Sequence, residues 1–389
     1  MLTIDEGKPL IIPKNELDER LANSLFQRYG KIISIEFPSI ATRGCYILRS
    51  TNYIGNLSIG RDLIVRMAPK VPIHDIFRML EYAYGLQPLD GRVKVDRLDE
   101  LYEHLALLLA RMVRDRVRKG LYQGYVVKED ALPYFRGRLS IPITIRNEMR
   151  GAPWIGSEYE DICTDIEDNR ILAWTLYILP RLYIERPDVI HEVRMAYHAL
   201  AGSVTVRPIG AQVLIGRSYS HLNEDYRLMH SICKFFLDNC GPTMALGPNE
   251  FVPFLVNMPL LFQNYVAEWL KANMPKGWVV HEQCPFRVPL YGTFHMDMVI
   301  TDITKGPLLV LDTKYKDGEK PQAADIHQMV SYSHMAGVKK TVLVYPSDVK
   351  FSRLNVNGIG IDGLSFDINK EPDVAGQEFL SKIHILMGH

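Results

Sequence analysis

Two aspartates and a lysine stand near the ends of neighbouring apolar segments in the C-terminal third of the chain. Asp297 lies in an apolar segment that starts at Phe294, and Asp312 and Lys314 directly follow the apolar run Leu308–Leu311. Side chains on a strand alternate between its two faces, so Asp312 and Lys314 should share one face. A buried strand that delivers two charges to one point indicates a functional site.

A short turn between these segments would bring the two carboxylates together. Gly306–Pro307 breaks the apolar pattern at the expected place. If the hairpin is centred between Thr304 and Lys305, Asp297 lies directly opposite Asp312, with Cβ atoms about 5 Å apart. A slip of one residue would turn every side chain to the other face, so the site depends on this register.

Two carboxylates and a lysine on one face predict the chemistry of a metal-dependent phosphodiesterase acting on nucleic acid. Mg²⁺ prefers oxygen ligands and often takes only one or two carboxylates, together with waters and phosphate oxygens. It polarises the phosphate and acidifies a bound water, while Lys314 would orient that water or neutralise developing charge. The alternative is a surface hairpin with a solvated pair between an acid and Lys314.

A helix and a further strand are predicted after the hairpin. The helix spans Pro321–Ala336, with proline near its start and Gly337 after its end. Gln328 and Tyr332 are four residues apart and therefore share a helix face, although ordinary helix packing would also place them there. The strand is expected at Lys339–Tyr345, where apolar residues follow two lysines.

Before the hairpin, Pro259–Lys271 is predicted to be an amphipathic helix that carries Glu268. The order helix, strand, strand, helix, strand resembles the core of the PD-(D/E)xK nuclease superfamily. Gln328 and Tyr332 resemble the additional helix motif of its RecB-like branch. The resemblance implies metal ligands at Asp297 and Asp312 and catalytic roles for Asp297, Asp312, Lys314, Gln328 and Tyr332.

The segment Leu308–Tyr332 narrows the resemblance to the McrC family, the nuclease subunits of McrBC-type modification-dependent restriction systems. Family members commonly have Leu-Phe-Glu where this chain has Leu261-Phe-Gln263, which leaves Glu268 as a possible substitute metal ligand. They commonly have Arg-Pro where this chain has His295-Met296, which leaves the metal and lysine positions intact. Further similar stretches are Tyr53–Leu57, Pro69–Lys70, Met79–Leu86, Gly120–Tyr125, Arg136–Leu139 and Thr164–Asn169.

Length and pattern predict a multidomain protein of mixed α+β and α/β class, because 389 residues exceed one ordinary core. We expect an N-terminal β-rich or α+β domain over residues 1–95 and a mostly helical middle region over 96–250. A PD-(D/E)xK, restriction endonuclease-like α/β domain would follow over 251–389. Further predicted elements are strands at Ile32–Phe37, Cys45–Leu48 and Asp62–Met67 and helices at Ile73–Tyr84 and Asp99–Lys119.

Cysteine usage and hydropathy indicate the cellular setting. The five cysteines are scattered without a C-x-x-C pair, so neither a disulfide framework nor a zinc site is supported. No apolar run reaches the length of a membrane span, and the N-terminus lacks the pattern of a signal peptide. We therefore expect a cytoplasmic protein with no membrane partner, and the McrC resemblance implies a prokaryotic one.

The formal net charge is zero, whereas a protein that binds DNA alone often carries a basic excess. The balance indicates either a partner that holds the DNA or local basic clusters. One such cluster is expected around the active site, formed by Lys305, Lys314, Lys316 and Lys320. For the basic stretch Arg111–Lys119, a solvated helix face and a contact with phosphate or an acidic partner both remain open.

The absence of a G-x-x-x-x-G-K-[ST] loop indicates that this chain does not bind nucleotide by that motif. The McrC resemblance implies that DNA is the substrate, Mg²⁺ the cofactor, and a hexameric McrB-like AAA+ ring the partner that binds GTP. It also implies that the N-terminal and middle regions dock on that ring and stimulate its hydrolysis, with Arg136 and Arg138 as candidates. Two alternatives stay open: a stand-alone repair nuclease of the same superfamily, and a non-catalytic adaptor that activates the motor.

Overall fold

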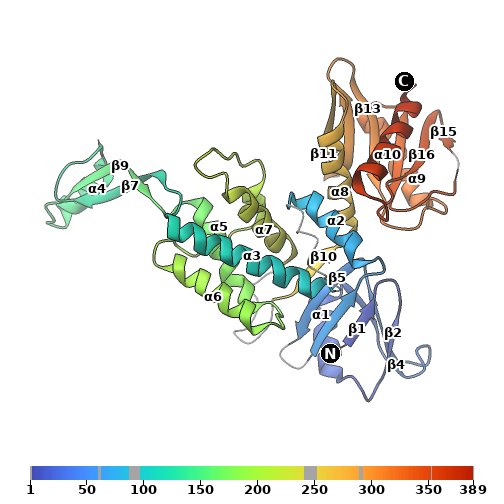
Figure 1. Cartoon of the computed structure of the whole chain (residues 1–389), viewed down its shortest axis with the longest axis horizontal. Helices are drawn as coiled ribbons and strands as arrows, with labels where there is room; N and C mark the ends of the chain where they lie inside the picture. The colour runs from blue at the N-terminus through green and yellow to red at the C-terminus, as the bar shows by residue number, and fades with distance from the viewer. Residues whose placement is uncertain are drawn as a thin grey trace. The chain divides into compact units, whose positions relative to one another are not determined.

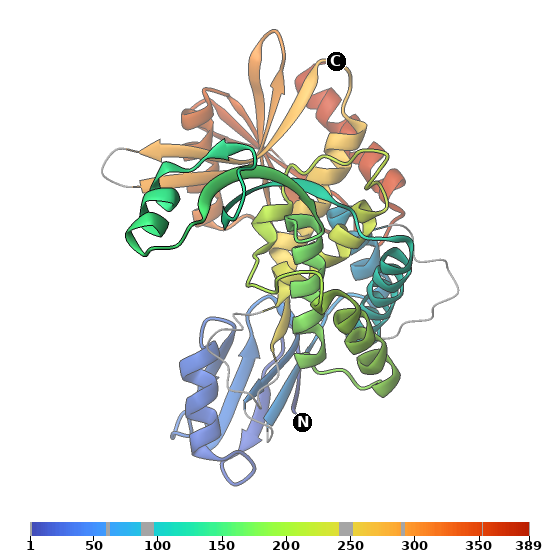
Figure 2. The ribbon, with the colours of Figure 1, turned by 90° about the vertical axis from the view of Figure 1, so that its left-hand side faces the viewer.

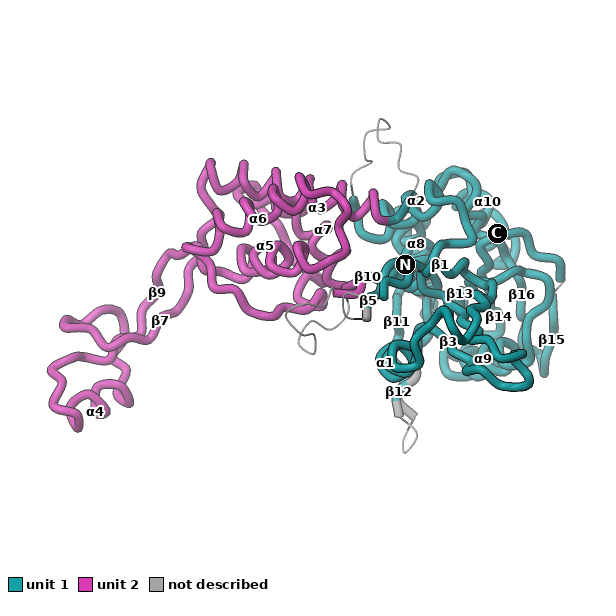
Figure 3. Tube along the Cα trace, turned by 90° about the horizontal axis from the view of Figure 1, so that it is seen from below, with its two compact units in different colours: residues 1–98, 255–389 teal, residues 99–254 magenta. Residues whose placement is uncertain are grey.

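The computed structural model describes residues 2–59, 63–86, 97–240, 252–288, 292–351 and 353–388. The chain divides into two compact units, unit 1 formed by residues 1–98 and 255–389, and unit 2 formed by residues 99–254 (Figure 3). The predicted boundaries at 95/96 and 250/251 lie outside the described residues, so the division into three domains stays a prediction. No helix in the described ranges is long and apolar enough to cross a membrane.

Two small sheets and one helix form the first part of unit 1 (Figure 1). They enclose an apolar core in which Ile4, Leu25, Leu48 and Val65 are fully buried. One sheet has the order β1-β6-β5-β10 and the other β2-β4-β3, so most elements of this part are strands. The elements are β1 (Leu2–Asp5), β2 (Leu10–Pro13), α1 (Glu19–Tyr29), β3 (Ile33–Glu36), β4 (Cys45–Ser50), β5 (Tyr53–Ile59), β6 (Leu63–Ala68) and β10 (Phe254–Asn257).

A six-stranded mixed sheet, with order β11-β12-β13-β14-β16-β15, forms the second part of unit 1 (Figure 2). β13 pairs in parallel with β14, and β14 in parallel with β16, while the other pairs are antiparallel. The central strands are nearly continuous apolar runs because both of their faces are covered. The strands are β11 (Trp278–Val288), β12 (Gly292–Asp302), β13 (Gly306–Thr313), β14 (Lys340–Tyr345), β15 (Leu354–Val356) and β16 (Ile359–Ser365).

Helices cover both faces of this sheet. On one face, α9 (Ala323–Ala336) contributes Met329 and Tyr332 to a cluster with Val310 and Leu343 of the central strands. Residues next to these in β13 and β14 point to the opposite face. That face is covered by α8 (Met258–Asn273) and α10 (Pro372–Met387), and α2 (Ile73–Tyr84) packs on α8. The predicted helices at 73–84, 259–271 and 321–336 are confirmed to within two residues.

Aromatic side chains fill the layer between α8, α10 and the sheet. Tyr265 and Trp269 of α8 contact Phe366 with ring centroids 5.2 and 5.6 Å apart, and Phe366 contacts Phe379 of α10 at 5.5 Å. A Cβ added to Gly376 would lie 2.1 Å from the Trp269 ring. Glycine is therefore required for the close approach of α10 to α8.

The predicted hairpin register is confirmed where β12 and β13 pair. Met298 lies opposite Leu311. Extending this pairing by one residue places Asp297 opposite Asp312. The turn is short, because β12 runs to Asp302 and β13 begins at Gly306, and the register shifts after Ile300. β11 was not predicted; it is an edge strand that contains Pro285, which only an edge position tolerates.

Unit 2 contains a helical body and a smaller β module. The body consists of α3 (Leu98–Lys119), α5 (Glu167–Ile178), α6 (Pro187–Ala201), α7 (Tyr226–Asn239) and the 3₁₀ turns η1 (Leu179–Arg181) and η2 (Ala211–Leu214). The β module, residues 124–163, was not predicted and comprises β7 (Gly124–Leu132), β8 (Arg138–Leu139), α4 (Ile141–Met149) and β9 (Ile155–Cys163). Its strands are largely exposed, so their sequence carries little apolar alternation.

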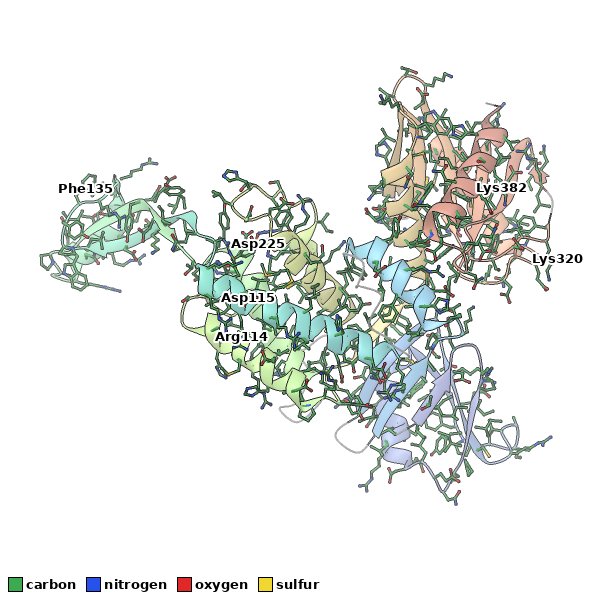
Figure 4. The ribbon with its side chains drawn as sticks, viewed as in Figure 1. Arg114, Asp115, Phe135, Asp225, Lys320 and Lys382 are labelled. Atoms are coloured by element: carbon green, nitrogen blue, oxygen red, sulfur yellow. The ribbon has the colours of Figure 1, made fainter. Side chains whose placement is uncertain are left out.

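Acidic neighbours pair with several cations of the basic stretch Arg111–Lys119. Arg114 bonds Glu192 at 2.5 Å, and Arg116 lies 3.6 Å from Asp225. Figure 4 labels Arg114 and Asp115 on α3 and Asp225 at the start of α7. These pairs lie within unit 2, so they favour a structural role for Arg114 and Arg116 over a free phosphate-binding surface.

Buried polar side chains join the root of the β module to the helical body. Asn169 donates hydrogen bonds to the carbonyl oxygens of Tyr122 and Thr164, at 2.9 and 2.7 Å, and accepts one from the Tyr226 hydroxyl at 2.6 Å. The network satisfies polar groups that would be costly to bury alone.

His230 continues this polar layer in α7. Its Nε2 lies 3.1 Å from the Asp168 carbonyl, which can only accept, so Nε2 carries the hydrogen. Its Nδ1 lies 3.0 Å from the Tyr219 hydroxyl, which then donates to it. Burial lowers the pKa of His230 to about 4, so the imidazole is neutral at physiological pH.

We expect unit 2 to lose stability on mild acidification because of His230. Its pKa falls from 6.5 to about 4 on folding. Between these two pH values the unfolded state binds more protons than the folded state, so the free energy of unfolding decreases as the pH is lowered. The loss from pH 7.5 to pH 5 should be about 2 kcal/mol. Hydrogen exchange of the α7 amides measures it, and His230→Gln should remove that pH dependence; an unchanged dependence in this variant would assign it to other groups.

Candidate active site

Candidate catalytic residues lie at the C-terminal end of β13, on the sheet face that α9 covers. Asp312 is 1% exposed, and the strand ends one residue later at Thr313. The backbone N–H of Lys314 still donates to the Val344 carbonyl at 2.8 Å. The backbone of Lys314 is therefore held by the parallel pairing with β14, although the residue lies beyond the end of β13.

Asp297 is fixed from the neighbouring strand by Thr313. The backbone N–H and the hydroxyl of Thr313 both donate to Oδ2 of Asp297, each at 2.9 Å. Both bonds fall on one oxygen, which leaves Oδ1 for a further ligand. Parity predicts Thr313 on the opposite face, but its hydroxyl reaches Asp297 because the strand ends there.

The surroundings of Asp312 disfavour its ionised form. Burial and then the charge of Asp297 raise the pKa of Asp312 to about 6, against the opposing effect of Lys314. Its Oδ2 is inaccessible to solvent and lies 2.5 Å from the Lys314 ammonium, although this contact lacks the direction of a good hydrogen bond. An oxygen in this state has a lone pair available to a cation.

A chain of hydrogen bonds orients Lys314 from α9. The ammonium donates to Oε1 of Gln328 at 2.9 Å, and Nε2 of Gln328 donates to the Tyr332 hydroxyl at 2.9 Å. The Tyr332 hydroxyl donates in turn to the His295 carbonyl at 2.8 Å. Burial is the largest single influence and opposes the charge of Lys314, but the negative charges of Asp312, Asp325 and Asp297 together outweigh it and raise the pKa of the ammonium. Lys314 is thus a fully charged cation in a defined position.

The donor set fits a small, hard cation held by two carboxylates. Asp297 and Asp312 offer oxygen ligands, and Mg²⁺ commonly takes one or two of these with waters and phosphate oxygens. In the described part of the chain no three His, Cys, Asp or Glu residues form a group that could hold a metal ion.

Glu268, the third predicted metal ligand, is not brought to Asp297 and Asp312. It lies on α8, which covers the sheet face opposite to α9. Its carboxylate accepts from Lys271 at 2.8 Å, and Lys271 also pairs with Glu282 of β11 at 2.7 Å. The structure thus brings together five of the six predicted site residues and leaves Glu268 apart.

The predicted basic cluster is only partly formed. Lys314 and Lys316 both face Asp325, with Nζ–O distances of 3.6 and 2.5 Å. Lys305 is in the hairpin turn, roughly 20 Å along β13 from the site by the strand rise, so its prediction was wrong. Lys320 is exposed on the segment between β13 and α9 (Figure 4).

Sequence reasoning missed Asp325 and Lys70. Asp325 is three residues before Gln328 on α9, and this spacing was a usable signal because it places both on one helix face. Lys70 follows β6 in the N-terminal part of unit 1, and its Nζ lies 4.7 Å from the ring centroid of Tyr315. Tyr315 also contacts Phe262 of α8, at 6.3 Å between ring centroids. The residue after Lys314 is therefore anchored by elements far from it in sequence.

The chain is similar to components of McrBC restriction systems. The family model described as McrBC 5-methylcytosine restriction system component matches residues 48–346. The chain is 24% identical to the type IV methyl-directed restriction enzyme EcoKMcrBC of Escherichia coli strain K12, over 80% of this chain and 97% of that protein. Its fold resembles a chain in the refined half-complex from the tetradecameric assembly of Thermococcus gammatolerans McrB AAA+ hexamers with bound McrC, with TM-score 0.55, 18% identity, and coverage of 98% of this chain and 99% of that chain.

We expect Asp297→Asn and Asp312→Asn each to weaken binding of Mn²⁺, used as a probe for Mg²⁺, by at least about tenfold, because each removes a charged oxygen ligand. Isothermal titration calorimetry measures the affinity in the purified chain. Glu268→Gln is the matched control and should change it by less than about twofold. A larger loss in Glu268→Gln than in Asp297→Asn would reverse the ligand assignment.

Proposed function

This chain belongs to the family of McrBC 5-methylcytosine restriction system components, and we propose that it is the DNA-cleaving subunit of such a system. The observation that supports this most strongly is the cluster at the end of β13. There a buried carboxylate, Asp312, lies beside Asp297 and 2.5 Å from Lys314. We further propose that the six-stranded sheet with α8 and α9 is a PD-(D/E)xK nuclease core.

The proposed reaction is Mg²⁺-dependent hydrolysis of a DNA phosphodiester bond. Asp297 and Asp312 would hold the ion through their carboxylate oxygens. A bound Mg²⁺ supplies Lewis-acid polarisation of the phosphate and lowers the pKa of a coordinated water. With its pKa at about 6, Asp312 is mostly ionised at neutral pH and able to serve as a ligand.

Lys314 contributes positive charge where the phosphate gains negative charge. Its side chain is 17% exposed, so it is largely shielded from bulk solvent yet able to reach a phosphate at the surface. Charge stabilisation is stronger in such a partly desolvated position than in water, provided that the group is already oriented. Gln328 and Tyr332 supply that orientation through their bonds to Lys314 and to the His295 carbonyl.

The proposed partner is a hexameric McrB-like AAA+ ring that binds GTP. The solved relative contains McrB AAA+ hexamers with bound McrC, and we infer the same association here. The β module of unit 2 offers a surface for it, because several large apolar side chains are exposed there, such as Tyr125, Phe135, Met149 and Trp154. Exposed apolar groups gathered on so small a module are typical of a protein-binding surface.

The helix α4 carries the most exposed of these side chains. Met149 is 84% exposed and lines a cavity of ≈ 390 Å³ together with Pro142, Ile145, Arg146 and Arg150. Of the two arginines proposed to stimulate GTP hydrolysis, Arg136 is paired with Asp161 at 3.1 Å and lies over the Tyr159 ring, whereas Arg138 is exposed on β8. Arg138 is therefore the more available of the two.

We expect Met149→Glu to lower stimulation of the partner's GTPase by about tenfold, because it places a charge in an apolar interface. The initial rate of phosphate release, measured at subsaturating concentrations of this chain, reports the effect. Ile385→Glu is the matched control, since Ile385 is 75% exposed on α10 of unit 1. Equal stimulation by Met149→Glu and wild type would exclude the α4 surface from the contact.

The decisive test of the function is cleavage of a methylated DNA duplex by the purified chain with its cognate AAA+ subunit, GTP and Mg²⁺. We expect little specific cleavage by the isolated chain, since its neutral charge argues against strong binding to phosphates alone. Asp312→Ala should reduce cleavage by about a thousandfold or more while stimulation of GTP hydrolysis remains, because removing a ligand affects only the metal site.

Each alternative has its own outcome in this experiment. Efficient cutting without GTP or partner would favour a stand-alone nuclease. GTPase stimulation without any cleavage by the wild type would favour a non-catalytic adaptor. Full Mg²⁺-dependent cleavage by folded Asp312→Ala protein would place the active site elsewhere.

A further inference from the structure

Asp325 is a buried carboxylate that faces both lysines of the active-site segment. It lies in the first turn of α9 and is 6% exposed. Its Oδ2 accepts from Lys316 at 2.5 Å and from the backbone N–H of Gln322 at 2.9 Å. Its Oδ1 lies 3.6 Å from the Lys314 ammonium. The two oxygens of one carboxylate therefore divide between two cations.

The charge balance of the site depends on this residue. Asp297, Asp312 and Asp325 carry three negative charges against the two positive charges of Lys314 and Lys316, so the cluster is negative by one when all are ionised. Burial works against the charged form of Asp325, but the bonds from Lys316 and Gln322, together with the charges of Lys314 and Lys316, outweigh it and lower the pKa of the carboxyl. The surroundings of Asp325 thus favour its anionic form beside Lys314.

Lys314 and the proposed metal ion would compete for the same carboxylate, Asp312. Its ammonium lies closest to Asp312, which is also a proposed cation ligand. A carboxylate that shares its charge with a cation attracts an ammonium less, and a buried ammonium without a partner is costly. Gln328, the other bonded partner of Lys314, is neutral and cannot replace the lost charge.

We propose that Asp325 is a positioning residue for Lys314, the anion that keeps its ammonium in the site when Asp312 serves the metal. Lys316 occupies the other oxygen and so prevents Asp325 from drawing Lys314 away from Gln328. The inference rests on the proposed nuclease function and adds a residue to it. It also assigns Lys316 to the site as the counter-ion of Asp325.

A purely structural role for Asp325 makes a different prediction. Asp325 and Gln322 form a capping box at the start of α9, in which each side chain accepts from the other's backbone N–H. Loss of either half should weaken the helix start to a similar extent. Gln322→Ala is therefore a matched control that disturbs the cap without touching the lysines.

The experiment compares Asp325→Asn, Asp325→Glu and Gln322→Ala in the complete assembly of this chain, its AAA+ partner, GTP, Mg²⁺ and methylated duplex. We expect Asp325→Asn to lower kcat for cleavage by about ten- to a hundredfold, as for a misplaced catalytic group, with KM changed by less than about twofold. Asp325→Glu should recover most of the rate because it restores the charge. Gln322→Ala should cleave at a near-normal rate.

Two readouts that do not depend on cleavage complete the design. Mn²⁺ affinity of Asp325→Asn should equal that of the wild type, which distinguishes a positioning residue from a ligand. Stimulation of GTP hydrolysis and the melting temperature should match those of Gln322→Ala, which shows that the variant is folded and docked.

Four results would overturn the inference: normal cleavage by Asp325→Asn, equal slowing by Gln322→Ala, no recovery in Asp325→Glu, or weakened Mn²⁺ binding in Asp325→Asn. Failure of the underlying function looks different. A wild-type assembly that does not cut DNA overturns the proposed function and this inference with it, whereas a cutting wild type with an equally active Asp325→Asn overturns the inference alone.

Discussion

The rest of the site depends on the cost of burying the carboxylate of Asp312. An ionised carboxylate loses its hydration in the sheet interior, and a second carboxylate close by increases the penalty. Lys314 offsets part of this cost, yet the pKa of Asp312 still rises to about 6. A site in this state favours an additional positive charge, which is the property that a cation-binding centre requires.

The surrounding elements keep the compensating charges in place. Parallel pairing with β14 holds the Lys314 backbone, and α9 directs its ammonium through Gln328 and Tyr332. Tyr315 anchors the next residue against α8 and Lys70, so the N-terminal sheets belong to the same compact unit as the site. Removing these elements would therefore disturb the site as well as any docking surface that they carry.

Buried polar groups of another kind are found in unit 2. Asn169 and His230 are hydrogen-bonded to neighbouring groups, and burial keeps the His230 imidazole uncharged. The β module of unit 2 instead leaves large apolar groups in solvent. A hydrogen-bonded root with exposed apolar groups agrees with the proposed contact to another protein, whereas the site of unit 1 has the negative charge that the proposed cation would need.

The sequence by itself determined the features that depend on local order along the chain. The apolar run before Asp312 sets a buried strand, the period of two sets the shared face of Asp312 and Lys314, and the spacing of Gln328 and Tyr332 sets their common helix face. The register of β12 and β13 follows from the same alternation.

Only the tertiary structure decided whether α8 or α9 covers a given face of the sheet, because both helices are apolar enough to pack on either side. This placed Asp325 of α9 beside Lys314 and left Glu268 of α8 on the opposite face. It also decided the pairing of edge strand β11 and of the exposed β module, whose residues are too little buried to carry a periodic signal.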